Sequence, residues 1–470
     1  MFRRLALCLL AAVTAAAPLD DIIGTARKAL ANEGVATAWK LTQQALADAP
    51  GSAPAHELAG EIHFRRGEIP EAETEFRAAV KLDSNFAPGW WGLARVADST
   101  ARYREAKDNF AKAHELAPDD PRIFRDWALH LKGQSQINAL ERLVSIFDPV
   151  RQAAELDDLR QRIVFDRAQG IRLFNVLASR YEKSETAMLS LVSANHIRSF
   201  GLEVIVNGTP FRLILDTGAS GVMIPRRLAE KAGVARLADA TFRGFGDNRQ
   251  LLGGYRGVAR EVRIGDIVFR DALISVSGQE SVGTADGLIG ADVFAEFLVT
   301  LDFPARMLRL TPLAGHQPDQ ELLEDHPAEA ALIRAHMGNP VSVYRFGHLL
   351  LVPGRVADSR AGLFVLDSGS ERTLLSYEMA SGTSNVDRDD RTGFRGLSGK
   401  VADVYKTGDL AIEFAGFRQK NLGMTAFDLW GQSRAIGTEI SGFLGLPVLE
   451  LFSLTIDYRD GIVSFERPVN

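Results

Sequence analysis

Two different periodicities divide the chain. Between about residue 19 and residue 135, small and aromatic residues recur at intervals of 34 positions. A period of this length is typical of stacked helix pairs. After about residue 186, apolar and β-branched runs are broken by Gly, Asn, Asp and Pro, and this pattern predicts strands and turns. The sequence therefore predicts a helical first part and a mainly β second part.

The helical part is expected to contain three repeats, over residues 19–52, 53–86 and 87–120. The recurring positions are small or aromatic: Ala38, Ala72 and Ala106; Ala45, Ala79 and Ala113; Thr42, Phe76 and Phe110. With Trp90 and Leu93 upstream, they resemble tetratricopeptide repeats, and Phe124, Trp127 and Leu131 indicate a degenerate fourth unit. The resemblance implies a concave face that binds substrate or a partner protein, and a purely structural role stays open.

The β part repeats itself at a longer interval. The stretch FRLILDTGASGVMIP, from Phe211, is echoed by GLFVLDSGSERTLLS, from Gly362, which places Asp216 and Asp367 151 residues apart. FRGFG from Phe242 is echoed by FRGLSG from Phe394, and later landmarks keep a similar offset. Because several ordered landmarks share nearly one spacing, the β part is predicted to be a duplicated lobe of roughly 130 residues.

Each lobe carries the same ordered set of motifs. An apolar run ends in Asp-Thr/Ser-Gly, and later come Leu288-Ile289-Gly290 in one lobe and Phe443-Leu444-Gly445 in the other. This order resembles the retropepsin-like aspartyl proteases, with two lobes fused in one chain as in pepsin. The resemblance covers about residues 186–470. It implies a multidomain α + β fold, in which a tetratricopeptide-repeat solenoid precedes an all-β bilobal acid-protease fold.

Paired carboxylates explain why two such motifs are needed. Peptide hydrolysis without a metal or a covalent nucleophile needs an activated water and a proton donor, and Asp216 and Asp367 supply both if they share one proton. The resemblance implies that the Thr217 and Ser368 hydroxyls interlock across the axis between the lobes. Buried backbone groups there need such a partner.

The remaining loop residues are expected to support this pair. Gly218 and Gly369 permit close approach of the lobes, where a Cβ would clash. Ser220 and Ser370 are also expected to support the loops. Ser370 has no hydroxyl counterpart in the first lobe, so we expect it to donate a hydrogen bond to Asp367, which would then carry the charge while Asp216 carries the proton.

Two hairpins, at residues 241–256 and 393–405, are candidate flaps over the cleft. Both contain Phe-Arg-Gly, and neither tip has the tyrosine that pepsin-like enzymes use, although Tyr255 and Tyr405 lie near the hairpin ends. This departure favours either two-flap closure, as in dimeric retropepsins, or altered substrate contacts. The candidate flap residues are Phe242, Gly244, Phe245, Gly246, Phe394 and Gly396.

Composition narrows the class of partner. The 470 residues carry a formal net charge of −6, which argues against a nucleic-acid partner because such binding needs basic patches. The sequence contains no metal-protease, serine-hydrolase or phosphate-loop motif, so no cofactor or metal is expected. Cys8 is the only cysteine, which leaves neither a disulfide nor a thiolate metal site.

The N-terminus follows the pattern of a secretory signal peptide. Arg3 and Arg4 precede an apolar stretch, and small residues run up to Ala17. A short membrane anchor is disfavoured because a spanning helix needs about 20 apolar residues. We therefore expect an exported protein, periplasmic or secreted, without a membrane span once the signal is removed.

These observations predict five segments and one function. The segments are a signal peptide (1–17), the repeats (18–135), a helical connector or cap (136–185), lobe 1 (186–315) and lobe 2 (316–470). The expected function is an exported aspartic endopeptidase with a polypeptide substrate and repeats that recruit substrate or partner. A non-catalytic peptide-binding scaffold with relic lobes is the alternative. Lobe fusion predicts a monomeric active site, and a dimer of whole chains stays open.

Overall fold

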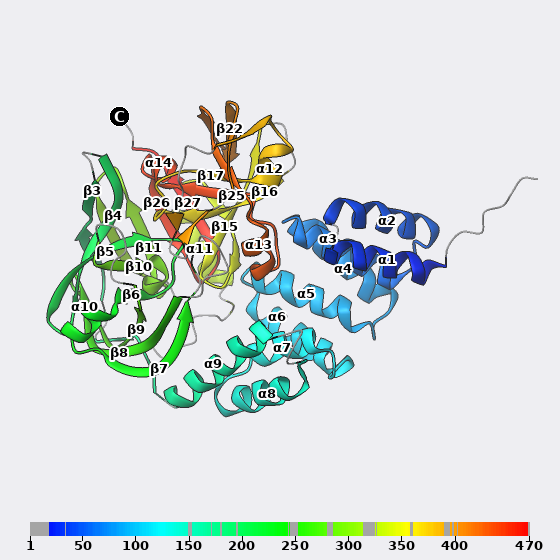
Figure 1. The fold of residues 1–470 in the computed structure, drawn as a ribbon, viewed down its shortest axis with the longest axis horizontal. Helices are drawn as coiled ribbons and strands as arrows, with labels where there is room; N and C mark the ends of the chain where they lie inside the picture. The colour runs from blue at the N-terminus through cyan, green and yellow to red at the C-terminus, as the bar shows by residue number, and fades with distance from the viewer. Residues whose placement is uncertain are drawn as a thin grey trace, which may run out of the picture.

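A computed structural model describes most of the chain. The described residues are 18–32, 34–148, 153–170, 172–178, 181–193, 196–242, 244, 252–279, 285–313, 325, 327–357, 361–389, 395–396, 399–401 and 403–468. Figure 1 shows a helical N-terminal half beside a β-rich C-terminal half. The predicted signal peptide, residues 1–17, lies outside the described residues.

The helical half is a stack of antiparallel helix pairs. Its described helices are α1 (Leu19–Asn32), α2 (Val35–Asp48), α3 (Ala53–Arg65), α4 (Ile69–Leu82), α5 (Ala87–Ser99), α6 (Tyr103–Leu116), α7 (Pro121–Leu129), α8 (Gly133–Ile146) and α9 (Ala153–Gln169). The first helices of successive pairs begin at residues 19, 53, 87 and 121, which confirms the 34-residue period and the degenerate fourth unit. The expected boundary after residue 135 lies inside α8.

Small residues allow these helices to approach closely. Ala38, Ala72 and Ala106 are fully or almost fully buried. The buried Phe76 ring fills the space beside Gly60 and Gly92, where an added Cβ would overlap it. Ser52 caps α3, because its side chain accepts a hydrogen bond from the Ala55 amide. The recurring residues are thus the core of the repeats.

The first lobe is built on a sheet with the described strand order β1-β9-β6-β10-β5-β4-β8-β7, with β3 paired to β4. Its strands are β1 (Val176–Leu177), β3 (Leu189–Ser193), β4 (His196–Val206), β5 (Thr209–Asp216), β6 (Val222–Pro225), β7 (Ala235–Phe242), β8 (Leu252–Ile264), β9 (Ile267–Ser277) and β10 (Gly287–Gly290). Two short helices, α10 (Arg226–Lys231) and the 3₁₀ helix η1 (Ala291–Phe294), complete it.

The second lobe repeats this plan. The described strand order is β18-β21-β24-β17-β25-β16-β15-β22-β23, with β14 paired to β15 and a separate β19-β20 hairpin. Its strands are β14 (Tyr344–Phe346), β15 (Leu349–Val356), β16 (Ala361–Asp367), β17 (Leu374–Ser376), β18 (Val386–Arg388), β19 (Arg395–Gly396), β20 (Gly399–Lys400), β21 (Val404–Thr407), β22 (Leu410–Phe414), β23 (Phe417–Asn421), β24 (Thr425–Phe427) and β25 (Gly442–Gly445). Its helices are α11 (Pro327–His336), α12 (Tyr377–Ser381), α13 (Trp430–Ile436) and α14 (Leu446–Leu449).

A third sheet joins the lobes. Its order is β13-β27-β26-β11-β12-β2, from β2 (Ser184–Ala187), β11 (Phe297–Asp302), β12 (Met307–Pro312), β13 (Pro340–Ser342), β26 (Ser453–Asp457) and β27 (Ile462–Glu466). Strands β11 and β26 pair antiparallel, and the Thr300 and Thr455 hydroxyls lie 3.1 Å apart across this pair. Asp302 and Asp457 end strands β11 and β26. The predicted fold class is therefore confirmed.

The repeats pack on the second lobe through a shared hydrophobic core. Phe64 of α3 and Val96 of α5 lie in one buried cluster with Leu351, Leu363 and Phe427 of lobe 2. Hydrogen bonds cross the same junction. The hydroxyl of Thr438 donates to the Phe64 carbonyl at 2.6 Å, and the Glu439 amide donates to the Arg65 carbonyl at 2.7 Å. The repeats are thus packed and hydrogen-bonded onto the second lobe, beside which they lie in Figure 1.

Candidate active site

Each predicted catalytic aspartate is the last residue of a strand that pairs in parallel with a short apolar strand. Asp216 is the last residue of β5, which pairs in parallel with β10 so that Gly290 is its register partner. Asp367 ends β16 in the same way, opposite Gly445 of β25. The repeated apolar-apolar-Gly motifs therefore pair alongside the strands that end in the two aspartates.

The Thr217 and Ser368 side chains interlock between the lobes. The Thr217 hydroxyl donates to the Leu366 carbonyl at 2.9 Å and accepts from the Ser368 amide at 2.9 Å. The Ser368 hydroxyl donates to the Leu215 carbonyl at 2.8 Å and accepts from the Thr217 amide at 3.1 Å. Thr217 and Ser368 are both buried, so each hydroxyl satisfies two backbone groups that water cannot reach. This reciprocal pattern holds the two loops together.

Glycine follows the interlocked residues because the opposite carboxyl occupies the space of a side chain. A Cβ on Gly369 would lie 2.5 Å from Asp216 Oδ2. A Cβ on Gly218 would lie 3.0 Å from Asp367 Cγ, a tighter contact than side chains normally make. The two carboxyl groups are hydrogen-bonded to each other. The structure thus brings together the two residues that the sequence selects from equivalent places in the two lobes.

Burial raises the pKa of both carboxyl groups. The interaction between the two groups makes their pKa values differ. The negative charge of Asp216 and the hydrogen bond to it raise the pKa of Asp367 further, well above its ordinary value. For Asp216, the Gly218 amide, the hydrogen bond from Asp367 and the charge of His348 oppose the effect of burial on its pKa. The two carboxyl groups therefore titrate as one coupled pair, and the pKa of Asp367 is the one raised further.

The Ser370 hydroxyl does not make the hydrogen bond expected of it. This hydroxyl donates to the Arg372 carbonyl at 2.8 Å, within its own loop, and is not aimed at Asp367. The Ser370 backbone amide bonds Asp367 instead, and an amide does not depend on the side chain. The expected hydrogen bond from the Ser370 hydroxyl to Asp367 is therefore wrong, whereas the expectation about which carboxyl carries the charge stays a prediction without this support. Ser370 still supports the loop, since its carbonyl accepts from the Leu446 amide at 2.9 Å.

Ser220 supports the first loop through an acidic partner. Its hydroxyl donates to Asp292 Oδ2 at 2.7 Å, and the Gly221 amide donates to Asp292 Oδ1 at 2.9 Å. Asp292 lies in η1, directly after the Gly290 strand. This carboxylate therefore ties the catalytic loop to the strand below it.

Both candidate flap hairpins form, and their tips lie partly outside the described residues. Strands β7 and β8 pair up to Phe242, which is buried against Met223 and Leu288, beside Ala219 of the catalytic loop. The second hairpin contains β18 and β21, with Gly396 in the small β19-β20 pair. Gly244 and Gly396 are described, whereas Phe245, Gly246 and Phe394 lie outside the described residues. The flap roles stay predictions.

Two residues that contact the catalytic loop and the first flap hairpin could not be predicted from the sequence. His348 lies in the turn between β14 and β15, and its Nε2 lies 3.2 Å from the Gly218 carbonyl oxygen. Gln161 of α9 accepts hydrogen bonds from the amide and hydroxyl of Thr241, at 2.9 and 3.1 Å, at the base of the first flap hairpin. Neither residue belongs to a repeated motif, and both contacts join segments far apart in sequence. Only the fold could reveal them.

Within the described part of the chain, no group of three or more His, Cys, Asp or Glu residues is arranged to hold a metal ion. None of the described helices is long and apolar enough to cross a membrane.

Comparisons with known proteins agree with this geometry. Residues 202–293 match the family model described as aspartyl protease, a stretch that includes Asp216 and the brace at Gly290. The first lobe is an aspartyl protease domain. A search of curated proteins gives no match.

Three solved structures are similar to parts of the chain. An aspartic proteinase from Irpex lacteus is 12% identical over 61% of this chain and 97% of its own, with a TM-score of 0.39. An O-GlcNAc transferase mutant from Thermobaculum terrenum is 21% identical over 27% of this chain and 26% of its own, with a TM-score of 0.25. Pseudomonas aeruginosa pilF is 24% identical over 32% of this chain and 72% of its own, with a TM-score of 0.27.

Proposed function

We propose that this protein is an aspartic endopeptidase that hydrolyses peptide bonds with a water activated by Asp216 and Asp367. The observation that carries the proposal is the reciprocal interlock of Thr217 and Ser368, which holds two half-buried carboxyl groups against each other. A relic that only bound peptides would not need a proton shared between two aspartates. The aspartyl protease match of the first lobe supports the same reaction.

In the mechanism that we propose, Asp216 is the ionised partner and Asp367 holds the proton, because the pKa of Asp367 is raised further. The Asp216 carboxylate accepts a proton from a water that attacks the scissile carbonyl carbon, while the Asp367 carboxyl donates its proton to the carbonyl oxygen. The tetrahedral species then collapses, the C–N bond breaks, and the leaving nitrogen takes a proton from Asp216. Asp367 regains its proton from the collapsing hydroxyl. One proton on the dyad is thus present before and after each turnover.

Cleavage of an unfolded protein tests this proposal. Casein should be cut by the purified chain at acidic pH, with cleavage blocked by pepstatin and absent in Asp216→Asn and Asp367→Asn. Circular dichroism of both variants checks that they fold. If the wild-type chain cuts nothing between about pH 3 and pH 7, where one ionised and one neutral carboxyl are expected, the alternative of a non-catalytic peptide-binding scaffold replaces it.

We further propose that the protein is exported, to the periplasm or beyond. The support is the charged, apolar and small-residue pattern of residues 1–17. Expression of the full chain should give a mature form that lacks about 15 to 17 residues by mass spectrometry, found in the exported fraction. A full-length product retained in the cytosol would contradict this proposal.

A further inference from the structure

In each lobe, the residue four positions before the catalytic aspartate is held by two hydrogen bonds from the chain that leads into the neighbouring short strand. In lobe 1, the Asp286 amide donates to the Arg212 carbonyl at 2.9 Å, and Asp286 Oδ2 accepts from the Arg212 amide at 2.9 Å. In lobe 2, the Ser441 amide donates to the Leu363 carbonyl at 2.8 Å, and the Ser441 hydroxyl accepts from the Leu363 amide at 3.2 Å. Equivalent backbone groups are thus bonded in both lobes, with a carboxyl group as acceptor in one and a hydroxyl in the other.

The Ser441 hydroxyl is in turn bonded to a carboxyl group. It donates to Glu439 Oε1 at 3.2 Å while it accepts from the Leu363 amide. Ser441 is fully buried and Glu439 is only 9% exposed. An amide, a hydroxyl and a carboxyl group therefore form one buried chain of hydrogen bonds, in which each member needs its partner because water does not replace it. Through Ser441, Glu439 takes the place that the Asp286 carboxyl group holds directly in lobe 1.

The segment that carries Glu439 and Ser441 is attached to the repeats. The hydroxyl of Thr438, a residue that is 1% exposed, donates to the Phe64 carbonyl at 2.6 Å. The Glu439 amide donates to the Arg65 carbonyl at 2.7 Å. Both carbonyl groups lie in the last turn of α3, where the carbonyl groups of a helix have no partner further along the same helix. Residues 438–439 therefore supply donors to the end of α3, and α3 in turn fixes these two residues.

The turn between α3 and α4 also contacts the catalytic strand itself. Gly67 in this turn has a φ of +72°, and a Cβ on it would lie 2.7 Å from Leu363 Cγ. Both the conformation and the close approach exclude a larger residue at this position. Leu363 is 1% exposed and lies in one buried cluster with Phe64. Leu363 is thus held through its backbone by Ser441 and through its side chain by the repeats.

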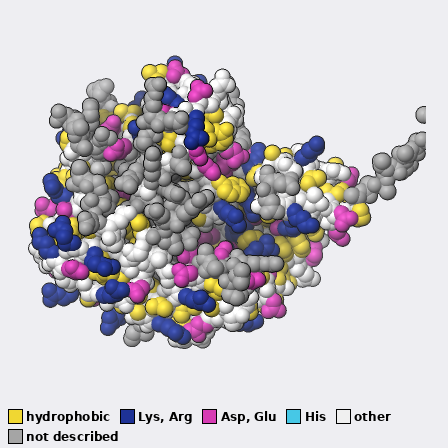
Figure 2. Space-filling view, in the orientation of Figure 1, with side chains coloured by type: hydrophobic (Ala, Val, Ile, Leu, Met, Phe, Trp, Pro, Cys, Tyr) yellow, Lys and Arg dark blue, Asp and Glu magenta, His cyan; other side chains and the backbone are white. Residues whose placement is uncertain are grey.

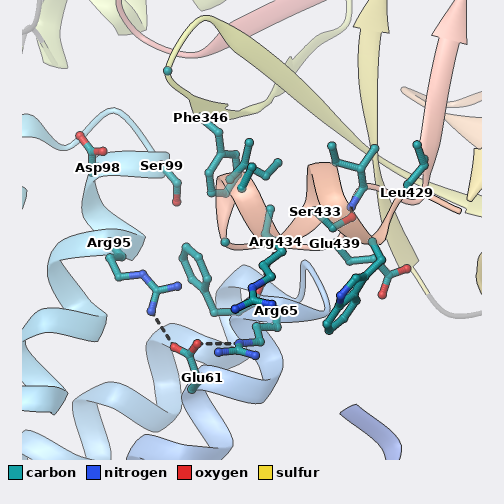
Figure 3. A pocket seen from close by; sticks show the side chains of 18 of the residues that line it. Glu61, Arg65, Arg95, Asp98, Ser99, Phe346, Leu429, Ser433, Arg434 and Glu439 are labelled. Atoms are coloured by element: carbon teal, nitrogen blue, oxygen red, sulfur yellow. Dashed lines mark hydrogen bonds and ion pairs between the residues drawn. The ribbon is translucent and has the colours of Figure 1, made fainter. Parts of the chain in front are cut away.

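A pocket of about 920 Å³ borders this junction, and Thr438 and Glu439 belong to its lining. Figure 3 shows Glu439 on the side of lobe 2, and Glu61 and Arg95 on the side of the repeats. In Figure 2, the surface is hollowed where the helical and β-rich halves meet. Open space therefore separates part of the two halves, and the hydrogen bonds of residues 438–439 join them at its border.

From these contacts we infer that the end of α3 and residues 438–441 position the strand that ends in Asp367. Thr438 and Ser441 are then positioning residues for the reaction, and they act through Leu363. This inference rests on the proposed peptidase function. It gives the repeats a part in catalysis besides the binding of any partner, because one catalytic strand is held from the repeats and the other by Asp286 of its own lobe.

Thr438→Val tests the inference with a mild change. The Phe64 carbonyl keeps its hydrogen bond from the Gly67 amide at 3.1 Å, so the full chain should still fold. The substrate is a quenched fluorescent peptide chosen from a site that the wild-type chain cuts in casein. The kcat should fall on the order of tenfold while KM changes by less than about twofold, because the reacting groups are displaced and the substrate contacts are not. Thr438→Ser keeps the hydroxyl and should cleave like the wild type.

The pH–rate profile separates positioning from a simple loss of stability. The negative charge of Asp216 and the hydrogen bond to it raise the pKa of Asp367. If the strand before Asp367 is held less firmly, this contribution weakens and the pair loses its proton at lower pH. The alkaline limb of the profile should therefore move to lower pH in Thr438→Val. It should move further in Ser441→Ala, which leaves the buried Leu363 amide without its acceptor.

Thr42→Val is the matched control. Thr42 of α2 is also buried, and its hydroxyl donates to the Ala38 carbonyl at 2.9 Å within the same helix. This variant should lower the thermal midpoint about as much as Thr438→Val, and should leave kcat and the alkaline limb unchanged. Unchanged kcat and an unmoved limb in both Thr438→Val and Ser441→Ala would overturn the inference, and so would the same changes in Thr42→Val.

Hydrogen exchange separates the inference from the proposed function, because it needs no cleavage. Exchange in peptides that contain Leu363 should accelerate about fivefold in Thr438→Val, the effect of one lost hydrogen bond, and should not change in Thr42→Val. If casein is never cut but exchange accelerates in this way, the peptidase function fails while the attachment of the strand to the repeats stands. If casein is cut but Thr438→Val changes neither exchange nor kcat, the inference fails while the function stands.

Discussion

Replacement of Thr217 by valine should loosen the catalytic loops far more than its small change in shape suggests. The hydroxyl of Thr217 is the partner of two backbone groups, the Leu366 carbonyl and the Ser368 amide, each at 2.9 Å. Thr217 is only 1% exposed, so water cannot replace it. Each orphaned group costs about 1–3 kcal/mol, and the pair therefore costs about 2–6 kcal/mol locally.

Hydrogen exchange at the Ser368 amide measures this loss directly. Because 1.4 kcal/mol corresponds to a factor of ten, exchange in peptides that contain Ser368 should accelerate by at least about 30-fold in Thr217→Val. Casein cleavage should fall in parallel, since the carboxyl groups lose their fixed separation. Tryptophan fluorescence would be a poor substitute: apart from Trp430, the tryptophans lie in the helical half.

Two matched variants make the test specific. Thr217→Ser keeps the hydroxyl and should behave nearly like the wild type, because Ser368 plays the same role in the other lobe. Thr300→Val removes a half-buried interlobe contact of 3.1 Å and should cost no more than about 1 kcal/mol. The reasoning fails if Thr217→Val exchanges and cleaves like Thr300→Val.

Three further changes test other parts of the site. Gly369→Ala should lower casein cleavage on the order of 100-fold, and more than Gly218→Ala, because its Cβ meets the opposite carboxyl more closely; equal losses would contradict this. His348→Ala should move the acid limb of the pH–rate profile to higher pH, because the charge of His348 lowers the pKa of Asp216; an unmoved limb in a folded, active variant would refute it. Burial raises the pKa of Asp457 to about 7, so the native state keeps a proton that the unfolded chain releases above about pH 4. The native state therefore loses stability as pH rises from about 4 to 7. Asp457→Asn should be more stable than the wild type at pH 7.5, by at most about 4 kcal/mol, but not at pH 4. The same difference in thermal midpoint between variant and wild type at both pH values would exclude this.

Local and repeated patterns were enough to predict the fold class and the residues brought together at the dyad. The 34-residue period fixes where helix pairs begin, since each small residue must meet the same neighbour in the next turn of the stack. The duplicated Asp-Thr/Ser-Gly motif places Asp216 and Asp367 at equivalent strand ends of the two lobes. Two lobes related by an approximate twofold axis bring such equivalent ends together at that axis.

Contacts without a repeated pattern could not be predicted in this way. The direction of the Ser370 hydroxyl depends on which acceptor lies nearer, and the Arg372 carbonyl of its own loop is the one it bonds. His348 and Gln161 act on loops that are 130 and 80 residues away in sequence. The packing of α13 against the inner face of the repeats likewise follows from tertiary structure. Such contacts determine the hydrogen bonds and charges around the two aspartates, whereas the motifs determine only where the aspartates lie.

The asymmetry of the dyad follows from the fusion of its two lobes. In a symmetric pair, either carboxyl would hold the proton equally well, and the interlock around Thr217 and Ser368 is symmetric in this sense. His348 breaks the symmetry, because it contacts the first loop from a turn of the second lobe. Arg345, in the strand before that turn, donates to the hydroxyl of Tyr103 on α6 at 3.2 Å and to the carbonyl of Tyr458 in the second lobe at 3.0 Å. The helical half therefore stabilises the residue that favours the charge on Asp216, and its removal should disturb the dyad as well as the pocket.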